Sequence, residues 1–151
     1  WGDQQKLALR EVGAWLAECR GQMRRRRSLT RPVFRLFGHA GTGKTTLATH
    51  LAQGVNVPVF GAFTGKAALM MQRKGCADAK TLHSLIYKAD EQHDGSFDYR
   101  LNRASDAAKA DLIVIDEVSM VGEDLGRDLM SFDRPILCLG DPGAAQFTVA
   151  K

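Results

Sequence analysis

The sequence predicts one α/β domain in which helices cover both faces of a mostly parallel β-sheet. Short apolar runs at 33–37, 57–63, 112–115 and 135–139 alternate with segments of helical periodicity, which is typical of a parallel sheet. A glycine-rich segment follows the first apolar run, and two adjacent acids follow the third. Because sites on such sheets form at the carboxyl ends of the strands, these polar segments support the same fold class.

The N-terminal segment is expected to be a unit of its own, residues 1–31, ahead of the main domain, residues 32–151. Apolar side chains recur at helical spacing over 3–20, and Asp3 can cap the start of this helix. Gly21 and the arginines that follow it predict a connector leading to the first strand.

Within the main domain, helices are expected to separate the strands. The predicted helical segments are 44–53, 66–73, 81–87 and 121–130. Asp94-Gly95 is a turn signal, and the short apolar segments before and after it, Ile86-Tyr87 and Phe97–Tyr99, could pair as a β-hairpin.

The positive charge of the chain is concentrated in one segment. The net charge is +4, yet seven of the 21 basic residues lie between residues 20 and 35, which leaves 14 basic residues against 17 acidic ones elsewhere. Such a cluster suits the phosphates of a nucleic acid, and it is equally typical of a solvated loop after a helix. The arginines are Arg20, Arg24, Arg25, Arg26, Arg27, Arg31 and Arg35.

The glycine-rich segment from Gly38 to Thr45 matches the phosphate-binding pattern G-x-x-x-x-G-K-[ST] at every position. Backbone amides in this pattern curl around a phosphate, and the helix that follows favours an anion at its N-terminus. Lys44 is expected to neutralise the β- and γ-phosphates of ATP, and the Thr45 hydroxyl to ligate Mg²⁺. The predicted ATP contacts here are Gly38, His39, Ala40, Gly41, Thr42, Gly43, Lys44, Thr45 and Thr46.

The acidic pair Asp116-Glu117 ends the apolar run of the third strand. Beside a phosphate loop, Asp116 is expected to hold Mg²⁺ through water, and Glu117 to act as the general base that polarises the attacking water. The predicted catalytic residues are therefore Lys44, Asp116 and Glu117, with ATP and Mg²⁺ as cofactors.

Further motifs indicate which class of ATPase the sequence resembles. Five segments, in this order and spacing, resemble motifs of the RecD-like branch of superfamily 1 helicases, superfamily 1B. They are Gln5-Lys-Leu-Ala8, Phe63-Thr-Gly-Lys-Ala-Ala68, Thr81-Leu-His-Ser-Leu-Ile86, Asp116-Glu-Val-Ser-Met120 and Leu139-Gly-Asp-Pro142. The resemblance covers residues 3 to 142 and implies the N-terminal RecA-like domain of such a helicase, a three-layer P-loop fold.

The resemblance implies roles for residues outside the phosphate loop. Gln5 would hydrogen-bond adenine, and Asp141 would lie near the γ-phosphate. The segment 87–103 occupies the place of the family's strand-separating pin. Contacts to single-stranded DNA would come from Thr64, Gly65, Lys66, Thr81 and His83.

The resemblance fails after Pro142. Gly143-Ala-Ala-Gln146 replaces the family's continuation of motif III, and no second RecA-like domain follows before Lys151. Because in-trans arginines contribute ~10³-fold or more to related reactions, we expect this chain alone to bind ATP weakly and hydrolyse it slowly. Unwinding would need the absent C-terminal RecA-like domain or a partner subunit.

Two other functions compete with an ATP-dependent DNA helicase motor. One is a non-catalytic ATP switch in a phage or recombination protein, and the other is a P-loop small-molecule kinase. The sequence has no secretory signal or membrane-length apolar run, and Cys19, Cys76 and Cys138 form no pair motif. We therefore expect reduced thiols, no membrane partner and a cytoplasmic, nucleoid-associated location in a bacterium or a phage-infected cell.

Overall fold

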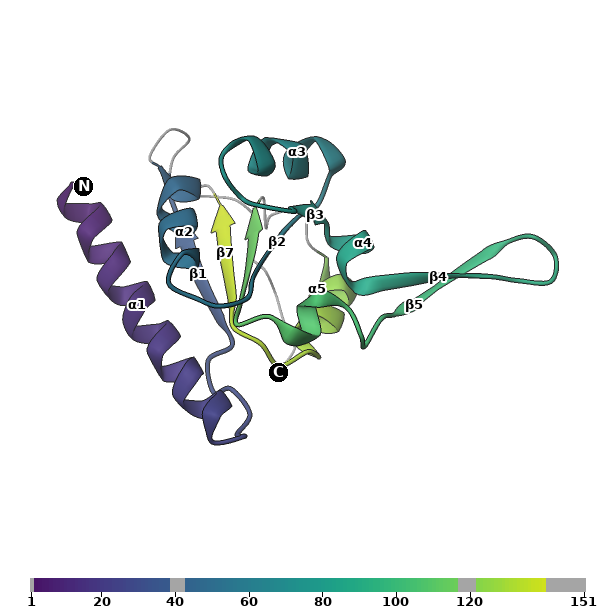
Figure 1. Cartoon of the computed structure of the whole chain (residues 1–151), viewed down its shortest axis with the longest axis horizontal. Helices are drawn as coiled ribbons and strands as arrows, with labels where there is room; N and C mark the ends of the chain where they lie inside the picture. The colour runs from purple at the N-terminus through teal and green to yellow at the C-terminus, as the bar shows by residue number, and fades with distance from the viewer. Residues whose placement is uncertain (1, 39–42, 117–121, 141–151) are drawn as a thin grey trace.

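A five-stranded parallel sheet forms the centre of the protein (Figure 1). The computed structural model describes residues 2–38, 43–116 and 122–140. The strands lie in the order β1-β7-β6-β2-β3, and every pair of neighbours is parallel, which confirms the predicted fold class. The strands are β1 (Val33–Phe37), β2 (Pro58–Ala62), β3 (Lys80–Thr81), β6 (Leu112–Asp116) and β7 (Ile136–Gly140).

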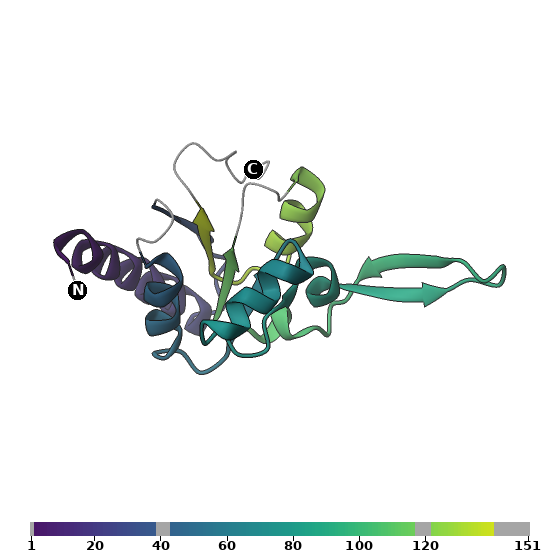
Figure 2. The same ribbon diagram turned by 90° about the horizontal axis from the view of Figure 1, so that it is seen from above.

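Helices cover both faces of this sheet and give the three layers (Figure 2). Helices α1, α2 and α3 pack on one face, and α4, the 3₁₀ helix η1 and α5 pack on the other. No helix in the described ranges is long and apolar enough to cross a membrane. The bounds are α1 (Asp3–Arg24), α2 (Lys44–Ala52), α3 (Gly65–Arg73), α4 (Leu82–Ile86), η1 (Asp106–Lys109) and α5 (Glu123–Met130).

The central strands are buried on both faces because successive side chains point to opposite layers. Leu112 and Val114 belong to the core under α1, α2 and α3, whereas Ile113 and Ile115 belong to the core under α4 and α5. All four side chains are fully buried. This is why the sequence of β6 is a continuous apolar run rather than an alternation of apolar and polar residues.

One predicted boundary was wrong, and two short elements were missed. Helix α1 ends at Arg24, whereas the sequence predicted a connector from Gly21. The extra turn is stabilised from outside the helix, because the Gln22 amide donates to the Thr30 hydroxyl at 2.9 Å and Met23 packs on the core. The short edge strand β3 and the 3₁₀ helix η1 were not predicted at all, since segments this short carry no periodic signal.

Strands β4 (Tyr87–Glu91) and β5 (Phe97–Leu101) form a separate antiparallel hairpin that projects from the body of the molecule (Figures 1 and 2). Its register pairs Tyr87 with Leu101 and Glu91 with Phe97. Gly95 at the tip has φ = +84°, a conformation that few residues other than glycine adopt readily. The hairpin therefore lies where the sequence expected an insertion.

Candidate nucleotide and nucleic-acid site

Three strands bring the principal candidate residues to one edge of the sheet. Gly38 follows β1, Gly140 ends β7 and Asp116 ends β6, with β7 lying between the other two strands. The Gly38 amide donates to the Gly140 carbonyl at 3.0 Å, which joins the start of the phosphate loop to the end of β7. Two strand spacings place β1 and β6 about 10 Å apart.

The Lys44 ammonium group connects the residues at the ends of β1 and β7. Its Nζ donates to the Gly38 carbonyl at 2.5 Å and to the Gly140 carbonyl at 3.0 Å. The side chain is half-buried at the first residue of α2. The helix N-terminus and the ammonium group thus place positive potential at the same point, which suits a phosphate.

Gly43 shows why the loop needs glycine immediately before the lysine. It is the N-cap of α2 with φ = +83°, in the left-handed region. A Cβ at this position would lie 3.2 Å from Nε2 of Gln5, so the space is also limited. Gly43 accepts the first intrahelical bond of α2, from the Leu47 amide at 2.9 Å.

Gln5 reaches the phosphate loop from the first turn of α1. Its Oε1 accepts from the Gly2 amide at 2.8 Å, and its Nε2 faces Gly43. Position 5 lies far from position 43 in the sequence, and only the packing of α1 beside α2 brings these residues together. Gln5 therefore lies beside the segment that the sequence predicts to hold ATP.

Thr45 and Asp116 are the described residues that carry the oxygen atoms expected to hold Mg²⁺. Thr45 is half-buried in the first turn of α2, Thr46 is exposed, and Asp116 is half-buried at the end of β6. Hydroxyl and carboxylate oxygens are the ligand types that Mg²⁺ prefers, so these two residues fit the expected metal. The other predicted site residues lie outside the described residues, namely His39, Ala40, Gly41, Thr42, Glu117 and Asp141.

The predicted DNA-contacting residues lie at the same carboxyl edge, on the side of β2 and β3. Thr64 is the N-cap of α3, and its hydroxyl accepts from the Ala67 amide at 3.1 Å. Gly65 and Lys66 are exposed at the start of that helix. Thr81 caps α4 in the same way by accepting from the Ser84 amide at 3.3 Å. Both threonines therefore have a structural role that the motif resemblance did not reveal.

His83 is exposed, and its ring contacts the Tyr87 ring at a centroid distance of 5.3 Å. Tyr87 starts the projecting hairpin, and its hydroxyl donates to Asp128 of α5. Burial, followed by this hydrogen bond, raises the pKa of Tyr87. The base of the hairpin is thus tied to α5, the helix that follows the acidic motif. Sequence reasoning missed this contact, since the two partners share no motif.

Sequence reasoning also missed a contact between the half-buried Thr49 and the buried Cys76. The Thr49 hydroxyl donates to the Thr45 carbonyl at 2.7 Å and lies 3.7 Å from the Cys76 sulfur. Burial raises the pKa of the Cys76 thiol, and the negative charge of Asp116 raises it further. Cys76 is therefore a neutral packing residue below the expected metal ligands.

Comparison with known proteins supplies independent information. A family model described as an AAA domain, AAA_19, matches residues 23–145. No curated protein matches the chain significantly.

Several solved structures share the fold. Unliganded Pif1 from Bacteroides sp. is 25% identical with a TM-score of 0.54, and the match covers 88% of this chain and 30% of that chain. Bacteroides sp. Pif1 with ADP-AlF4 is 24% identical with a TM-score of 0.56, covering 88% and 31%. Bacteroides Pif1 helicase with ADP-AlF3 and single-stranded DNA is 26% identical with a TM-score of 0.53, covering 82% and 31%. The chain thus spans less than a third of the length of these proteins.

Proposed function

We propose that this chain, which belongs to the AAA domain family, is the ATP-binding motor domain of an ATP-dependent DNA helicase. The observation that supports this most directly is the position of Lys44, whose ammonium group bonds Gly38 and Gly140 in front of α2. The fold is the RecA-like α/β fold of the Pif1 structures, in agreement with the resemblance to superfamily 1B seen in the sequence motifs.

In this proposal the nucleotide lies along the N-terminus of α2. Lys44 neutralises the β- and γ-phosphates, the loop from Gly38 to Thr46 wraps them, and Gln5 contacts the adenine. Nucleotide binding is supported by the Pif1 structures, one of which holds ADP-AlF4. Mg²⁺, held by Thr45 and Asp116, would neutralise charge that develops on the phosphates. Asp141 would lie near the γ-phosphate.

DNA would cross the same edge of the sheet at the side of β2 and β3. Single-stranded DNA is present in one of the Pif1 structures, which supports this class of partner. The proposed contacts are Thr64, Gly65, Lys66, Thr81 and His83. Translocation would require a second RecA-like domain, in the same polypeptide or in a partner. Movement along DNA needs two domains that hold the strand alternately. Such a motor would act in the cytoplasm at the nucleoid, in DNA recombination or repair.

Glu117→Gln tests whether the site hydrolyses ATP or only senses it. The substitution removes the proposed general base, so we expect phosphate release to fall by about 10²–10⁴-fold while ATP affinity changes little. Single-turnover hydrolysis and titration with a fluorescent ATP analogue measure the two quantities. The control is Glu123→Gln, which changes an exposed acid at the start of α5. Unchanged phosphate release in the Glu117 variant would favour the ATP switch over the motor.

The hairpin is the proposed strand-separating element. Phe97 is 59% exposed and Tyr99 is 70% exposed, both in β5. They lie two residues apart in one strand, so their side chains share a face of the hairpin. Exposed aromatic rings on a projecting element can stack on bases, which is worth about 1–3 kcal/mol per base.

We expect the double substitution Phe97→Ser and Tyr99→Ser, in the motor containing this domain, to slow unwinding of forked DNA at least tenfold. DNA-stimulated ATP hydrolysis should change less than twofold, because neither ring belongs to the core. Lys88→Gln is the matched control, since Lys88 lies on the opposite face of the same hairpin. Equal losses of unwinding and of hydrolysis would argue against a separating role.

A further inference from the structure

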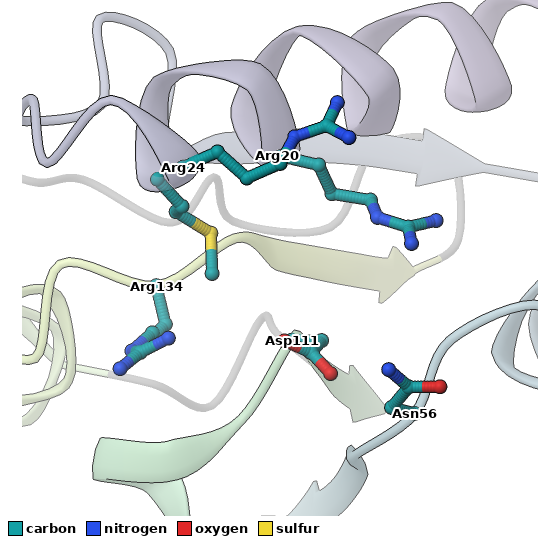
Figure 3. Close-up of a pocket in the computed structure, with 6 residues that line it drawn as sticks. Arg20, Arg24, Asn56, Asp111 and Arg134 are labelled. Atoms are coloured by element: carbon teal, nitrogen blue, oxygen red, sulfur yellow. The ribbon is translucent and has the colours of Figure 1, made fainter.

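A second basic site lies at the opposite edge of the sheet (Figure 3). It is a pocket with a cavity volume of about 350 Å³. In the close-up, Arg20 and Arg24 extend from α1 over one side of the pocket, and Arg134, Asp111 and Asn56 lie on the other side. The lining residues are Arg20, Met23, Arg24, Asn56, Asp111 and Arg134.

The topology separates this pocket from the nucleotide site. Asn56 precedes β2, Asp111 precedes β6 and Arg134 precedes β7, so all three lie at the amino edge of the parallel sheet. Lys44 and Asp116 lie at the carboxyl edge. A strand of five residues spans about 16 Å, which is the approximate separation of the two edges.

The charge of the pocket is unbalanced. Three arginines line it against one aspartate. That carboxylate is engaged, because Asp111 Oδ2 accepts from the Val57 amide at 3.0 Å. Within the described ranges, no side-chain hydrogen bond or ion pair joins Arg20, Arg24 or Arg134 to another residue.

The dipole at the C-terminus of α1 explains only some of the arginines that line the pocket. Cations near the C-terminus of α1 are favoured by the helix dipole, which accounts for Arg24. Arg134 comes instead from the connection between α5 and β7, far along the chain, and still lines the same pocket. The exposed Arg25, Arg26 and Arg27 follow α1 directly and extend the basic surface beyond the pocket.

We propose that this pocket binds the phosphodiester backbone of a nucleic-acid strand, as a contact separate from the motor site. Guanidinium groups match phosphate oxygens in a two-pronged geometry and suit phosphate better than other cations do. The volume lies in the range that holds small-molecule groups, so one nucleotide unit can enter. The three consecutive arginines that follow α1 add positive charge beyond the pocket, which suits a polymer with several phosphates rather than one free ion. The inference does not depend on ATP hydrolysis.

The test is a double substitution, Arg20→Gln with Arg24→Gln, and a single one, Arg134→Gln. Anisotropy of a fluorescein-labelled single-stranded oligonucleotide, without ATP and over a series of salt concentrations, measures binding. We expect the double variant to bind about tenfold more weakly. The slope of log K against log salt should become shallower by about 0.7 for each phosphate of the single strand that the variant no longer neutralises.

The matched control is Arg10→Gln, an exposed arginine on the same helix that does not line the pocket. Ten residues of helix place it about 15 Å from Arg20. Equal weakening in the control, or affinity within twofold of the unmodified chain in the double variant, would overturn the proposal. Competition by inorganic phosphate without any effect of the substitutions on oligonucleotide binding would also overturn it, by assigning the pocket to a free anion. Circular dichroism melting confirms that each variant is folded.

The same variants separate this inference from the proposed function. Binding of a fluorescent ATP analogue should be unchanged in the arginine variants, because the nucleotide site is at the other edge. Lys44→Ala should lose nucleotide binding and keep the salt-dependent oligonucleotide binding that the pocket supplies. If ATP binding is absent from the unmodified chain but the arginine variants weaken oligonucleotide binding, only the motor proposal fails.

Discussion

Lys44→Ala should abolish detectable ATP hydrolysis by this chain and greatly weaken nucleotide binding. The Lys44 ammonium is the only described side-chain cation that bonds the carbonyls at both sides of the phosphate-loop entrance, Gly38 and Gly140. Removing a positioned donor from a transition-state charge typically costs on the order of 10²–10³-fold in rate. Phosphate release and titration with a fluorescent ATP analogue measure the loss.

The control for this prediction is Lys109→Ala, which removes an exposed lysine from η1 on the other layer of the molecule. It should retain the hydrolysis rate and the nucleotide affinity of the unmodified chain. A Lys44 variant that binds ATP within threefold of the unmodified chain would contradict the assignment of the phosphate site.

Leu137→Ala should lower the free energy of unfolding more than any other substitution proposed for this protein. Leu137 is fully buried in β7, the strand between β1 and β6, and it packs in the core beneath α1, α2 and α3. Truncating a buried leucine costs about 2–5 kcal/mol, a large part of the roughly 5–15 kcal/mol by which domains are stable. Urea unfolding followed by circular dichroism measures the change in the free energy of unfolding.

Leu69→Ala is the matched comparison, because Leu69 is 47% exposed on α3. Its truncation should change the free energy of unfolding by less than about 0.5 kcal/mol. Equal destabilisation by the two substitutions would mean that β7 does not form the core described above. A destabilised β7 should also weaken nucleotide binding, since Gly140 at its end accepts from Lys44.

The strand and the helix on either side of the glycine-rich motif could be predicted because the pattern that indicates them is local. β1, a glycine-rich segment and the N-terminus of α2 follow one another directly within residues 33–52. The positive φ of Gly43 and the start of α2 at Lys44 follow directly from that pattern. The strand before Asp116 was equally recognisable, because burial on both faces requires an uninterrupted apolar run.

The roles of residues outside the core were harder to predict from motifs alone. Thr64 and Thr81 were singled out as DNA contacts, yet each hydroxyl also caps a helix. A short motif does not distinguish a residue kept for a ligand from one kept for a helix end, because both uses need a small hydroxyl at the same position.

The sequence by itself determined the fold class, the order of the main elements and the start of α2 at Lys44, because these depend on periodicity and on neighbouring residues. Only the tertiary structure decided which strands are neighbours, and so placed the Gly140 carbonyl 3.0 Å from the Lys44 ammonium. It likewise placed Gln5 beside Gly43 and gathered Arg20, Arg24 and Arg134 around one pocket. The physical reason is that these contacts form when segments far apart in the sequence pack together to bury apolar side chains. Local sequence preferences do not determine which distant segments become neighbours.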